Sequence, residues 1–498
     1  MPTADAVIAA LDQHGVQRQR ITVDSRSLVH GDVFVAVPGV RTDGRDFMAA
    51  AASLGAAAIL REPAGAGAHA LAIPVIDVPN LSMNLGDIAS AFYGNPSAHV
   101  RVFGVTGTNG KTSIVNWLAQ AYSLLGQPCG AIGTLGVSLG EQSWPTHNTT
   151  PDAASVHTIL RDLRAAGAQA VAMEVSSHAL ELGRVAGVRF ASTIFSNLTQ
   201  DHLDFHGSMQ AYGAAKAKLF TDYPAQRRIV NADDTFGAAL IARGLANTVS
   251  YGLNHGDVRA EVVSMSSSGM QLELHYEGAT STIHTPLIGR FNAENLMAVA
   301  TNLLADHVAI DTVTAVLGKL AAVPGRMQRI VTESTASLPS VYVDYAHTPD
   351  ALAKALDTVR ETKPQSLAVV FGCGGDRDRS KRPLMGKIAA DRADRVYVTS
   401  DNPRSESPES IVTEVASGFA ANSARKSILL RRDAIHTAIT EASANDAILI
   451  AGKGHENYQE IAGVRHPFSD VLEAQIALTE WGTSVCNAPQ SVGHQHVV

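Results

Sequence analysis

Apolar runs of strand length alternate with helix-periodic segments over most of this chain. Such runs occur within residues 102–112, 170–178, 193–199 and 228–234, with helical patterns between them. Strands that alternate with helices are typical of a parallel sheet covered on both faces. The pattern therefore predicts a doubly wound α/β domain in the middle of the chain.

The first 98 residues predict a smaller α/β domain. Residues 33–37 and 74–78 are apolar runs that favour strands, and the Ala-rich, periodic stretch at 47–60 favours a helix. Asn95-Pro96 is a residue pair typical of a linker. We therefore place the first domain boundary after residue 98.

Residues 258–288 lose the helical period. Residues 262–276 and 281–288 approximate strand alternation, and Gly269 and Gly278 stand where turns are needed. This pattern predicts antiparallel hairpins appended to the central domain.

After Pro324-Gly325-Arg326 the alternation of strands and helices returns. Apolar runs at 341–345, 367–371, 395–399 and 447–451 each end in a polar cluster. This pattern predicts a Rossmann-like third domain. The predicted fold class is thus α/β, with domains at residues 1–98, 99–325 and 326–498.

Composition and charge narrow the function classes. Hydrophobic residues make up 45% of the 498 residues and charged residues 17%, which favours a folded chain with a large core. The formal net charge of -8 lacks the basic footprint of a dedicated nucleic-acid binder. We therefore expect no nucleic-acid partner, whereas a local cluster could still bind a nucleotide.

The cysteines and the N-terminus indicate the compartment. Cys129, Cys373 and Cys486 show neither metal-ligand spacing nor a disulfide framework. The N-terminus has no basic segment followed by an apolar run, and no stretch approaches the ~20 apolar residues of a membrane span. We predict a cytoplasmic protein with no membrane partner, and we expect a monomer.

The most informative stretch follows the apolar run at 102–106. A glycine-containing turn leads into Lys-Thr at the start of a predicted helix, which favours a phosphate-binding loop over an ordinary strand-to-helix turn. The lysine would reach the terminal phosphates of a nucleotide, and the threonine hydroxyl would bind Mg²⁺. Val105 stands where the common pattern has glycine, so we expect a reshaped loop. This phosphate loop comprises Gly107, Thr108, Asn109, Gly110, Lys111 and Thr112.

Polar side chains gather where the predicted central strands end. In doubly wound sheets, ligands bind at the carboxyl ends of the strands. Thr112 and Glu174 are ligand types that Mg²⁺ prefers, although Glu174 could instead form a structural ion pair. The strand-end residues are Glu174, Ser176, His178, Asn197 and His202.

Other candidates each admit two interpretations. His202 could be a ligand of a second metal or a structural histidine, and Lys216 alone would be interpreted as a solvated helix lysine. Asp344 and His347 could bind nucleotide or metal in the third domain. No nucleophile triad stands out, so these residues fit ATP-driven transfer better than hydrolysis.

Several short motifs follow the phosphate loop in order, up to about residue 470. They are Asn148-Thr149-Thr150-Pro151, Met173-Glu174-Val175-Ser176-Ser177-His178, residues 197–204, Gly289-Arg290-Phe291-Asn292, Pro324-Gly325-Arg326, Asp344-Tyr345-Ala346-His347 and Gly452-Lys453-Gly454-His455-Glu456. Together they resemble the Mur ligases, the ATP-dependent amide ligases of peptidoglycan synthesis.

The motif Asp401-Asn402-Pro403-Arg404 narrows this resemblance. It is similar to the branch of the family that adds meso-2,6-diaminopimelate as the third peptide residue. In that branch the arginine pairs with the distal carboxylate, which lysine lacks. A bidentate arginine–carboxylate pair is a physically sensible discriminator between the two amino acids.

The resemblance implies a reaction and its partners. UDP-N-acetylmuramoyl-L-alanyl-D-glutamate, ATP and meso-2,6-diaminopimelate would give the UDP-linked tripeptide, ADP and phosphate. The side-chain carboxylate of D-glutamate would become an acyl phosphate, from which the amine displaces phosphate. The implied cofactors are ATP and Mg²⁺, with Lys216 carboxylated on its side-chain nitrogen by CO₂.

The resemblance also implies roles residue by residue. The catalytic residues would be Lys111, Glu174, His202 and Lys216, and the metal ligands Thr112, Glu174, His202 and Lys216. Beyond the phosphate loop, the ATP contacts would be Asn292, Arg326, Asp344 and His347. The UDP end would contact Val23, Ser25, Val40, Arg41 and Thr42, and the muramoyl dipeptide Asn148, Thr149, Thr150, Ser176 and Arg184. The amino acid would contact Arg377, Asp401, Asn402, Pro403, Arg404, Gly452 and Glu456.

One departure and three alternatives stay open at this point. Leu182 stands where many relatives have a glutamine that touches the dipeptide, so Leu182 is given no role. The alternatives are a lysine-adding relative, a folylpolyglutamate synthase, and a nucleotide-binding switch without ligase activity. A nucleotide-binding switch would leave the polar clusters of the third domain without a function.

Overall fold

A computed structural model describes residues 3–39, 42–65, 71–146, 148–333, 337–420 and 424–486, the last three by their backbone alone. Two compact units make up the chain, and each is described by itself. The first comprises Met1–Glu261, Glu273–Ser281 and Glu294–Leu317, and the second Val262–Leu272, Thr282–Ala293 and Gly318–Val498. None of the described helices combines the length and the hydropathy that a bilayer crossing requires.

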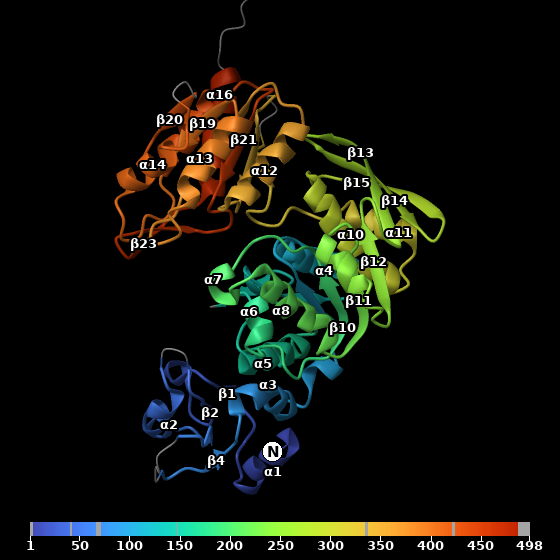
Figure 1. Cartoon of the computed structure of the whole chain (residues 1–498), viewed down its shortest axis with the longest axis vertical. Helices are drawn as coiled ribbons and strands as arrows, with labels where there is room; N and C mark the ends of the chain where they lie inside the picture. The colour runs from blue at the N-terminus through green and yellow to red at the C-terminus, as the bar shows by residue number, and fades with distance from the viewer. Residues whose placement is uncertain are drawn as a thin grey trace, which may run out of the picture. The chain divides into compact units, whose positions relative to one another are not determined.

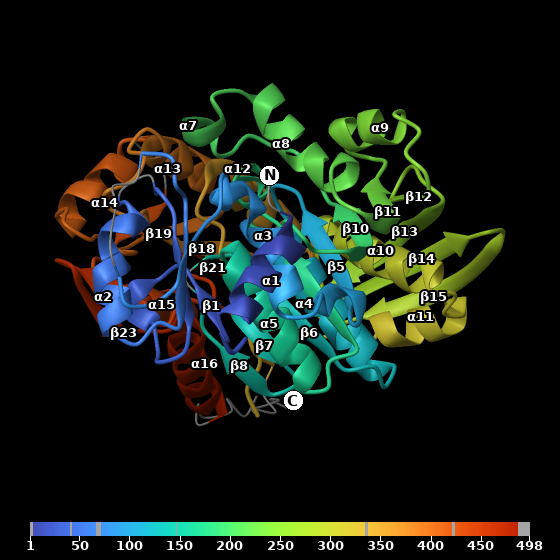
Figure 2. The same ribbon diagram turned by 90° about the horizontal axis from the view of Figure 1, so that it is seen from below.

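The N-terminal part of the first unit is a parallel sheet in the order β1-β2-β3-β4, with helices packed on it. α1 and α3 lie side by side (Figures 1 and 2) and bury Val7, Leu11, Leu81 and Leu85 against Val33 and Val35 of the sheet. The elements are α1 Ala4–Gln13, β1 Ile21–Thr22, η1 Ser25–Ser27, β2 Val33–Ala36, η2 Gly44–Phe47, α2 Met48–Ser53, β3 Ala58–Arg61, β4 Val75–Asp77, α3 Leu81–Phe92 and η3 Pro96–Ala98.

The helix predicted at residues 47–60 is wrong over its second half. α2 ends at Ser53, Gly55 follows with φ +87°, and β3 begins at Ala58. A glycine in the left-handed region is a common helix terminator. Ile59 and Leu60 are then fully buried as part of the sheet, so strand pairing overrides the helical propensity of the alanines.

The central sheet has the order β15-β14-β13-β12-β11-β10-β5-β9-β6-β7-β8. Its strands from β13 to β6 pair parallel, whereas β6, β7 and β8 pair antiparallel. The predicted hairpins are confirmed as β13 to β15. The strands are β5 Arg101–Thr106, β6 Cys129–Gly133, β7 Gly136–Leu139, β8 Gln142–Trp144, β9 Ala170–Glu174, β10 Phe190–Phe195, β11 Ala225–Asn231, β12 Thr248–Gly252, β13 Val258–Ser266, β14 Gly269–Tyr276 and β15 Ala279–Thr285.

Helices cover the parallel strands of this sheet. On one face, Val156 and Leu160 of α5 and Phe220 of α8 pack on Val102 and Val171 of the strands. α4 packs on β5, β6 and β9, so the phosphate loop lies between the central strand and a buried helix. The helices are α4 Lys111–Leu124, α5 Ala153–Ala165, α6 Ser177–Glu181, α7 Leu203–His206, α8 Met209–Thr221, α9 Thr235–Ile241, α10 Arg290–Ala305 and α11 Ile310–Leu317.

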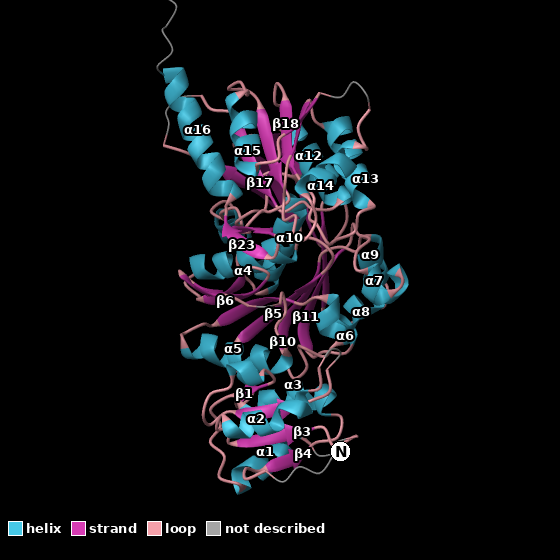
Figure 3. Cartoon of the chain, turned by 90° about the vertical axis from the view of Figure 1, so that its left-hand side faces the viewer, coloured by secondary structure: helices cyan, strands magenta, loops and turns pink. Residues whose placement is uncertain are grey.

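The C-terminal sheet has the order β16-β17-β21-β18-β19-β20, parallel except for β16. Alternate side chains of its strands face two helical layers, α12 to α14 on one face and α15 and α16 on the other (Figure 3). This confirms the Rossmann-like prediction for the third domain. The elements are β16 Gln328–Ile330, β17 Ser340–Asp344, α12 Pro349–Glu361, β18 Leu367–Phe371, α13 Lys381–Arg392, β19 Arg395–Val398, α14 Pro408–Ala416, β20 Arg425–Ser427, α15 Arg431–Thr440, β21 Ala447–Ala451, β22 Tyr458–Ile461, β23 Val464–Pro467 and α16 Asp470–Cys486.

Candidate active site

The phosphate loop joins the carboxyl end of β5 to the first residue of α4. Gly110 has φ +88°, and a Cβ built there would lie 2.3 Å from the Asn295 side-chain oxygen. Only glycine fits this combination of a left-handed backbone and a close neighbour. The loop therefore has the open backbone that close approach to an anion requires.

Two lysine ammonium groups converge on one carbonyl of this loop. Lys111 Nζ donates to the carbonyl oxygens of Gly107 and Thr108, each at 2.9 Å, and Lys216 Nζ donates to the Gly107 oxygen at 2.7 Å. Lys216 is only 1% exposed and lies over the Tyr212 ring. Burial, and after it the charge of Lys111, lowers the pKa of Lys216 well below its usual range. Lys216 is thus a buried amine, not the solvated helix lysine that its sequence context alone suggests.

The residues after β10 form the other wall of the loop. The Asn197 side-chain oxygen accepts the Asn109 N–H at 2.9 Å, and the Ser196 hydroxyl donates to the Asn109 carbonyl at 2.6 Å. Thr199 accepts the Thr108 hydroxyl on its carbonyl at 3.1 Å. These bonds fix the loop from the neighbouring strand. The sequence indicated Asn197 at this strand end but gave no sign of the part that Ser196 plays.

Glu174, at the end of β9, is a buried carboxylate for which the described residues provide no cationic partner. It is 1% exposed, and its two oxygens accept the Thr134 N–H at 2.8 Å and the Thr134 hydroxyl at 3.3 Å. A Cβ at Gly133 would lie 2.3 Å from one of these oxygens, so a glycine is needed beside it. The described residues place no lysine, arginine or histidine in an ion pair with Glu174, so the structural ion pair considered from sequence is absent there.

The residues predicted to contact the dipeptide meet around Thr150. Its hydroxyl donates to the Glu174 carbonyl at 2.8 Å and accepts the Ser176 N–H at 3.1 Å, and its carbonyl accepts a guanidinium N–H of Arg184 at 2.9 Å. Thr149 shares a hydroxyl contact of 3.3 Å with Thr134. Asn148, at the start of the same segment, is exposed. The structure therefore brings Thr150, Ser176 and Arg184 of this predicted set together, directly beside Glu174.

His202 lies in a small group of aromatic and imidazole rings. Its ring is 4.9 Å from that of His178, and its Nε2 lies 3.4 Å from a carboxylate oxygen of Asp201. His202 also has φ +51°, a conformation that few non-glycine residues adopt. Its half-exposed side chain could thus still reach a metal or a ligand.

The predicted UDP contacts follow the first two strands of the N-terminal sheet. Val23 and Ser25 come after β1, where Asp24 caps η1, and Thr42 lies in the turn after β2. Since β1 and β2 are parallel neighbours, these turns occupy the same edge of the sheet. Val40 and Arg41 lie outside the described residues.

In the second unit, three of the residues predicted to contact ATP lie beside β17, and the fourth, Asn292, lies on α10. Asp344 accepts the N–H groups of Met327 and Ala346 at 2.7 and 2.8 Å, and burial raises its pKa. The guanidinium of Arg326 lies 4.6 Å over the Tyr345 ring. The carbonyl of His347 accepts the Lys381 ammonium. Asn292, on α10, is 2% exposed and donates to the Ile288 carbonyl.

The amino-acid residues predicted after β19 and β21 form one hydrogen-bonded network. The Asn402 amide donates to Glu456 at 2.9 Å, and Lys453 Nζ binds both Asn402, at 3.1 Å, and Glu456, at 2.9 Å. Gly452 has φ +119°, and a Cβ there would lie 2.6 Å from an Asp401 oxygen. Sequence reasoning missed Lys453, which is fully buried; the only available signal was its place between two predicted contacts.

Arg404 is held between two loops. Its guanidinium donates to the Gly375 carbonyl at 2.7 Å and lies 3.9 Å from the Glu460 carboxylate, and its backbone has φ +52°. A Cβ at Gly375 would lie 1.9 Å from the Pro403 carbonyl, so the loops after β18 and β19 touch. Arg377, two residues beyond Gly375, is exposed on the first of these loops.

Two buried arginines that sequence reasoning missed support these loops. Arg431 and Asp470 are both fully buried and form two hydrogen bonds of 2.7 Å, and Arg431 also donates to the Ala451 carbonyl beside Gly452. Arg382 binds Glu406 and the Gly374 carbonyl from a fully buried position. Helix arginines carry no sequence signal that separates such roles from a solvated surface.

Models of the Mur ligase family match the chain in three consecutive parts. The family's catalytic domain matches residues 19–93, the Mur ligase middle domain residues 105–303, and the Mur ligase, glutamate ligase domain residues 325–454. The chain therefore belongs to the Mur ligase family, and its site is that of an ATP-dependent ligase.

A curated relative narrows the class. A UDP-N-acetylmuramoyl-L-alanyl-D-glutamate–2,6-diaminopimelate ligase of Chromobacterium violaceum is 47% identical over 483 residues, which are 95% of this chain and 97% of the relative. A solved structure of a ligase of the same name has a TM-score of 0.69 and 36% identity and covers 93% of this chain and 94% of its own. Within the family, the chain is of the MurE type.

More distant proteins share the fold of this chain without close sequence similarity. A Mycobacterium tuberculosis folylpolyglutamate synthase, solved with ADP and AMPPCP, has a TM-score of 0.62 over 80% of this chain and 95% of its own, at 17% identity. At that identity the likeness shows a common architecture, so it gives no support to the folylpolyglutamate alternative.

Proposed function

We propose that the protein joins meso-2,6-diaminopimelate to the D-glutamate of UDP-N-acetylmuramoyl-L-alanyl-D-glutamate at the expense of ATP, in peptidoglycan precursor synthesis. The observation that carries this proposal is 47% identity, over 95% of the chain, to a ligase of that name. The network around Asn402, Arg404 and Glu456 supports it, because it supplies cationic and polar groups for a diamino diacid.

In the proposed first step, ATP activates a carboxylate that would otherwise resist an amine. A side-chain carboxylate oxygen of the D-glutamate attacks the γ-phosphorus of ATP, the bond from that phosphorus to the β–γ bridging oxygen breaks, and ADP leaves. Lys111 and the N–H groups of the phosphate loop would stabilise charge on the transferred phosphoryl group. The product is an acyl phosphate.

In the proposed second step, the amine of diaminopimelate attacks the acyl carbon. The tetrahedral intermediate expels inorganic phosphate as the carbon–oxygen bond breaks, and the nitrogen loses a proton to give the amide. Thr150, Ser176 and Arg184 would orient the dipeptide, since they meet beside Glu174 at the carboxyl edge of the central sheet.

Thr112 and Glu174 fit a Mg²⁺ site. Glu174 is buried without a cationic partner among the described residues, and such a carboxylate is costly unless a cation approaches it. Mg²⁺ takes most of its ligands from water and phosphate, so one hydroxyl and one carboxylate can suffice from the protein. When bound, Mg²⁺ would neutralise charge on the phosphate oxygens.

Lys216 fits the proposed carboxylation. Burial, and after it the cation of Lys111, lowers the pKa of Lys216 well below its usual range, and the same cation would favour an anion at this nitrogen. In its unprotonated form the nitrogen would attack the carbon of CO₂ and lose a proton, which gives a carbamate. Together with His202, this group would supply ligands for a second Mg²⁺.

Arg404 is the proposed selector of the amino acid. Its guanidinium is fixed by the Gly375 carbonyl and remains close to Glu460, so it is positioned before any substrate arrives. A positioned guanidinium favours a substrate with a distal carboxylate over lysine by a charge-assisted pair. Arg377, Asp401, Pro403 and Gly452 complete the proposed amino-acid contacts.

Phosphate release tests the proposal against its alternatives. The purified protein receives ATP, Mg²⁺ and the UDP-dipeptide, with meso-2,6-diaminopimelate or L-lysine in turn. We expect release with diaminopimelate and little with lysine. Release with lysine alone would indicate a lysine-adding ligase. ATP binding without any amino-acid-dependent release would indicate a nucleotide switch.

The remaining assignments belong to the same proposal. The UDP contacts at Val23, Ser25 and Thr42, and the ATP contacts at Asn292, Arg326, Asp344 and His347, rest on the family resemblance. A cytoplasmic location and a monomeric state are likewise proposed, the first because the substrate is a UDP-linked precursor.

A further inference from the structure

A cavity of about 610 Å³ lies at the amino edge of the central parallel strands. Its lining includes Arg101, Phe190 and Ala225, the first residues of β5, β10 and β11. The phosphate loop follows the other end of β5, so this amino-edge pocket is separate from the site described above. Its volume is that of pockets which bind small organic ligands.

The formally charged side chains that line the amino-edge pocket are all arginines. They are Arg101, Arg189 and Arg228, and the lining contains neither aspartate nor glutamate. Asp306 forms an ion pair with Arg101 at 2.8 Å. The guanidinium of Arg228 donates to the carbonyls of Phe220 and Ala246, each at 2.9 Å, and pairs with no carboxylate among the described residues.

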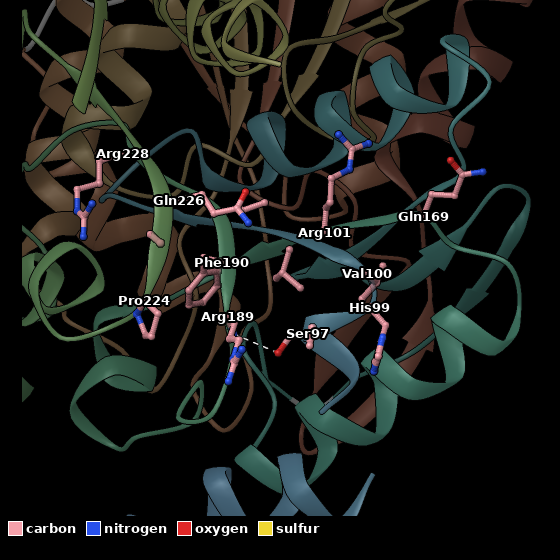
Figure 4. A pocket seen from close by; sticks show the side chains of 14 residues that line it. Ser97, His99, Val100, Arg101, Gln169, Arg189, Phe190, Pro224, Gln226 and Arg228 are labelled. Carbon is pink, nitrogen blue, oxygen red and sulfur yellow. Dashed lines mark hydrogen bonds between the residues drawn. The ribbon is translucent and has the colours of Figure 1, made fainter. Parts of the chain in front are cut away.

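Of these three arginines, Arg189 makes the fewest hydrogen bonds and ion pairs within the described residues. Its backbone N–H donates to the Ser97 hydroxyl at 3.1 Å, and the described residues provide no hydrogen bond or ion pair for its guanidinium (Figure 4). Two guanidinium groups for which the described part of the chain offers no carboxylate partner thus border one cavity, in a chain whose formal net charge is -8. Such a concentration of positive charge favours an anion.

The pocket also offers apolar surface. Pro224, labelled in Figure 4, and Ala98 are exposed apolar residues of this lining, whereas Phe190 and Val100 are buried. An inorganic anion would use only the cations and leave this surface in contact with water. A ligand that combines an anionic group with an apolar or aromatic part would use both kinds of lining.

We propose that the amino-edge pocket is a second ligand site, for an organic phosphate with an apolar or aromatic part. The phosphate would bind Arg189 and Arg228 through charge-assisted hydrogen bonds. The apolar part would cover Pro224 and Ala98. This site is independent of the proposed ligase reaction, so it can be tested without substrates of that reaction.

The test is a calorimetric titration of the full-length protein with phenyl phosphate, and separately with phenol and inorganic phosphate. We expect phenyl phosphate to bind more tightly than either fragment. Arg189→Gln and the near-isosteric Gln226→Glu, on the pocket lining, should each weaken it about threefold to tenfold. The matched control is Arg243→Gln, an exposed arginine outside the pocket.

A further variant separates this site from the phosphate loop. Lys111→Met should leave the affinity for phenyl phosphate unchanged if the ligand binds at the amino edge. The proposal fails if Lys111→Met abolishes binding, if phenol binds as tightly as phenyl phosphate, or if neither pocket variant differs from Arg243→Gln. Equal melting temperatures of the variants would show that their fold is intact, and absence of any binding would also overturn the proposal.

Discussion

Two buried lysines occupy opposite environments. Lys216 is 1% exposed and its ammonium meets a carbonyl and a second lysine, whereas the fully buried Lys453 meets the Glu456 carboxylate and the Asn402 amide. Desolvation penalises both charges. Among the described residues Lys453 forms an ion pair that offsets this penalty, whereas Lys216 forms none. Lys216 is therefore suited to chemistry on its nitrogen and Lys453 to fixing its neighbours.

The first prediction concerns Lys453. Lys453→Met keeps the volume but leaves Glu456 and the Asn402 oxygen without this donor, so we expect the free energy of unfolding to fall by about 2 kcal/mol. Since Asn402 and Glu456 are proposed amino-acid contacts, the KM for diaminopimelate should rise more than that for ATP. Denaturant melts and steady-state kinetics measure both effects. Equal changes in the two KM values would argue against a positioning role.

The second prediction concerns Arg404. Arg404→Ala removes the fixed guanidinium, so discrimination between diaminopimelate and lysine should largely disappear in a competition assay. Arg465→Ala, an exposed arginine on β23, is the control and should retain selectivity. Unchanged discrimination in Arg404→Ala would remove this residue from the proposed selector role.

The third prediction is that the stability of the protein depends on pH through the protonation of His455. Burial, and after it Arg326, lowers the pKa of His455 to about 4, against about 6.5 for an unfolded histidine. Between these values the unfolded chain binds a proton that the folded chain does not, so stability falls as pH drops from 6.5 to 4. His455→Gln should flatten this fall in melting temperature. His284→Gln, at an exposed histidine on β15, should follow the wild-type curve.

At the scale of elements, α4 has a left-handed glycine at each end, and the two differ in their surroundings. Gly110 has φ +88° and an Asn295 oxygen 2.3 Å from where a Cβ would lie, whereas Gly126 has φ +75° and open space. Both glycines relieve backbone strain, but only Gly110 also makes room for packing against α10. The start of α4 is thus far less tolerant of side chains than its end.

The fourth prediction compares these glycines. Gly110→Ala combines left-handed strain of about 1–2 kcal/mol with a clash against Asn295, so we expect a large loss of stability and of ATP-dependent phosphate release. Gly126→Ala incurs the strain alone and should keep its activity. Thermal melts and the phosphate assay compare the two variants. Equal losses of stability and activity in the two variants would show that the close approach of Asn295 to Gly110 affects neither.

Most helices and strands could be predicted from the sequence. The buried residues that hold the loops at their ends in place could not. The strands, the appended hairpins and the phosphate loop follow from local patterns, because periodicity and turn chemistry are local. The end of α2 was mispredicted, since Ala58 to Leu60 become a strand only through pairing with β2. Thr134 and Arg431 were missed because their partners are far away in the sequence, and so was the contact of Lys453 with Asn402, 51 residues away.

At the scale of the whole molecule, the proposed ligand contacts divide between the two compact units. The UDP contacts belong to the first unit, and the amino-acid contacts, from Arg377 to Glu456, belong to the second. A ligand stabilises the unit that binds it by an amount set by its concentration relative to its Kd. The two units should therefore respond to different ligands.

The fifth prediction follows from this division. In a calorimetric melt, UDP should raise the transition of the first unit and meso-2,6-diaminopimelate that of the second, each by about 5 °C near 100 times its Kd. Limited proteolysis at intermediate temperature would identify which unit has unfolded. A shift of the same transition by both ligands would contradict the assignment of their contacts.

The chain enters the second unit three times, first at Val262, again at Thr282 and finally at Gly318. Met265 and Phe291 pack against the same core as Leu352 and Met385, which are synthesised later. A truncated product that stops before β17 would leave Met265, on the hairpin strand β13, and Phe291, on α10, exposed. On the ribosome, the nascent chain exposes the same apolar side chains until the last third of the protein has been translated.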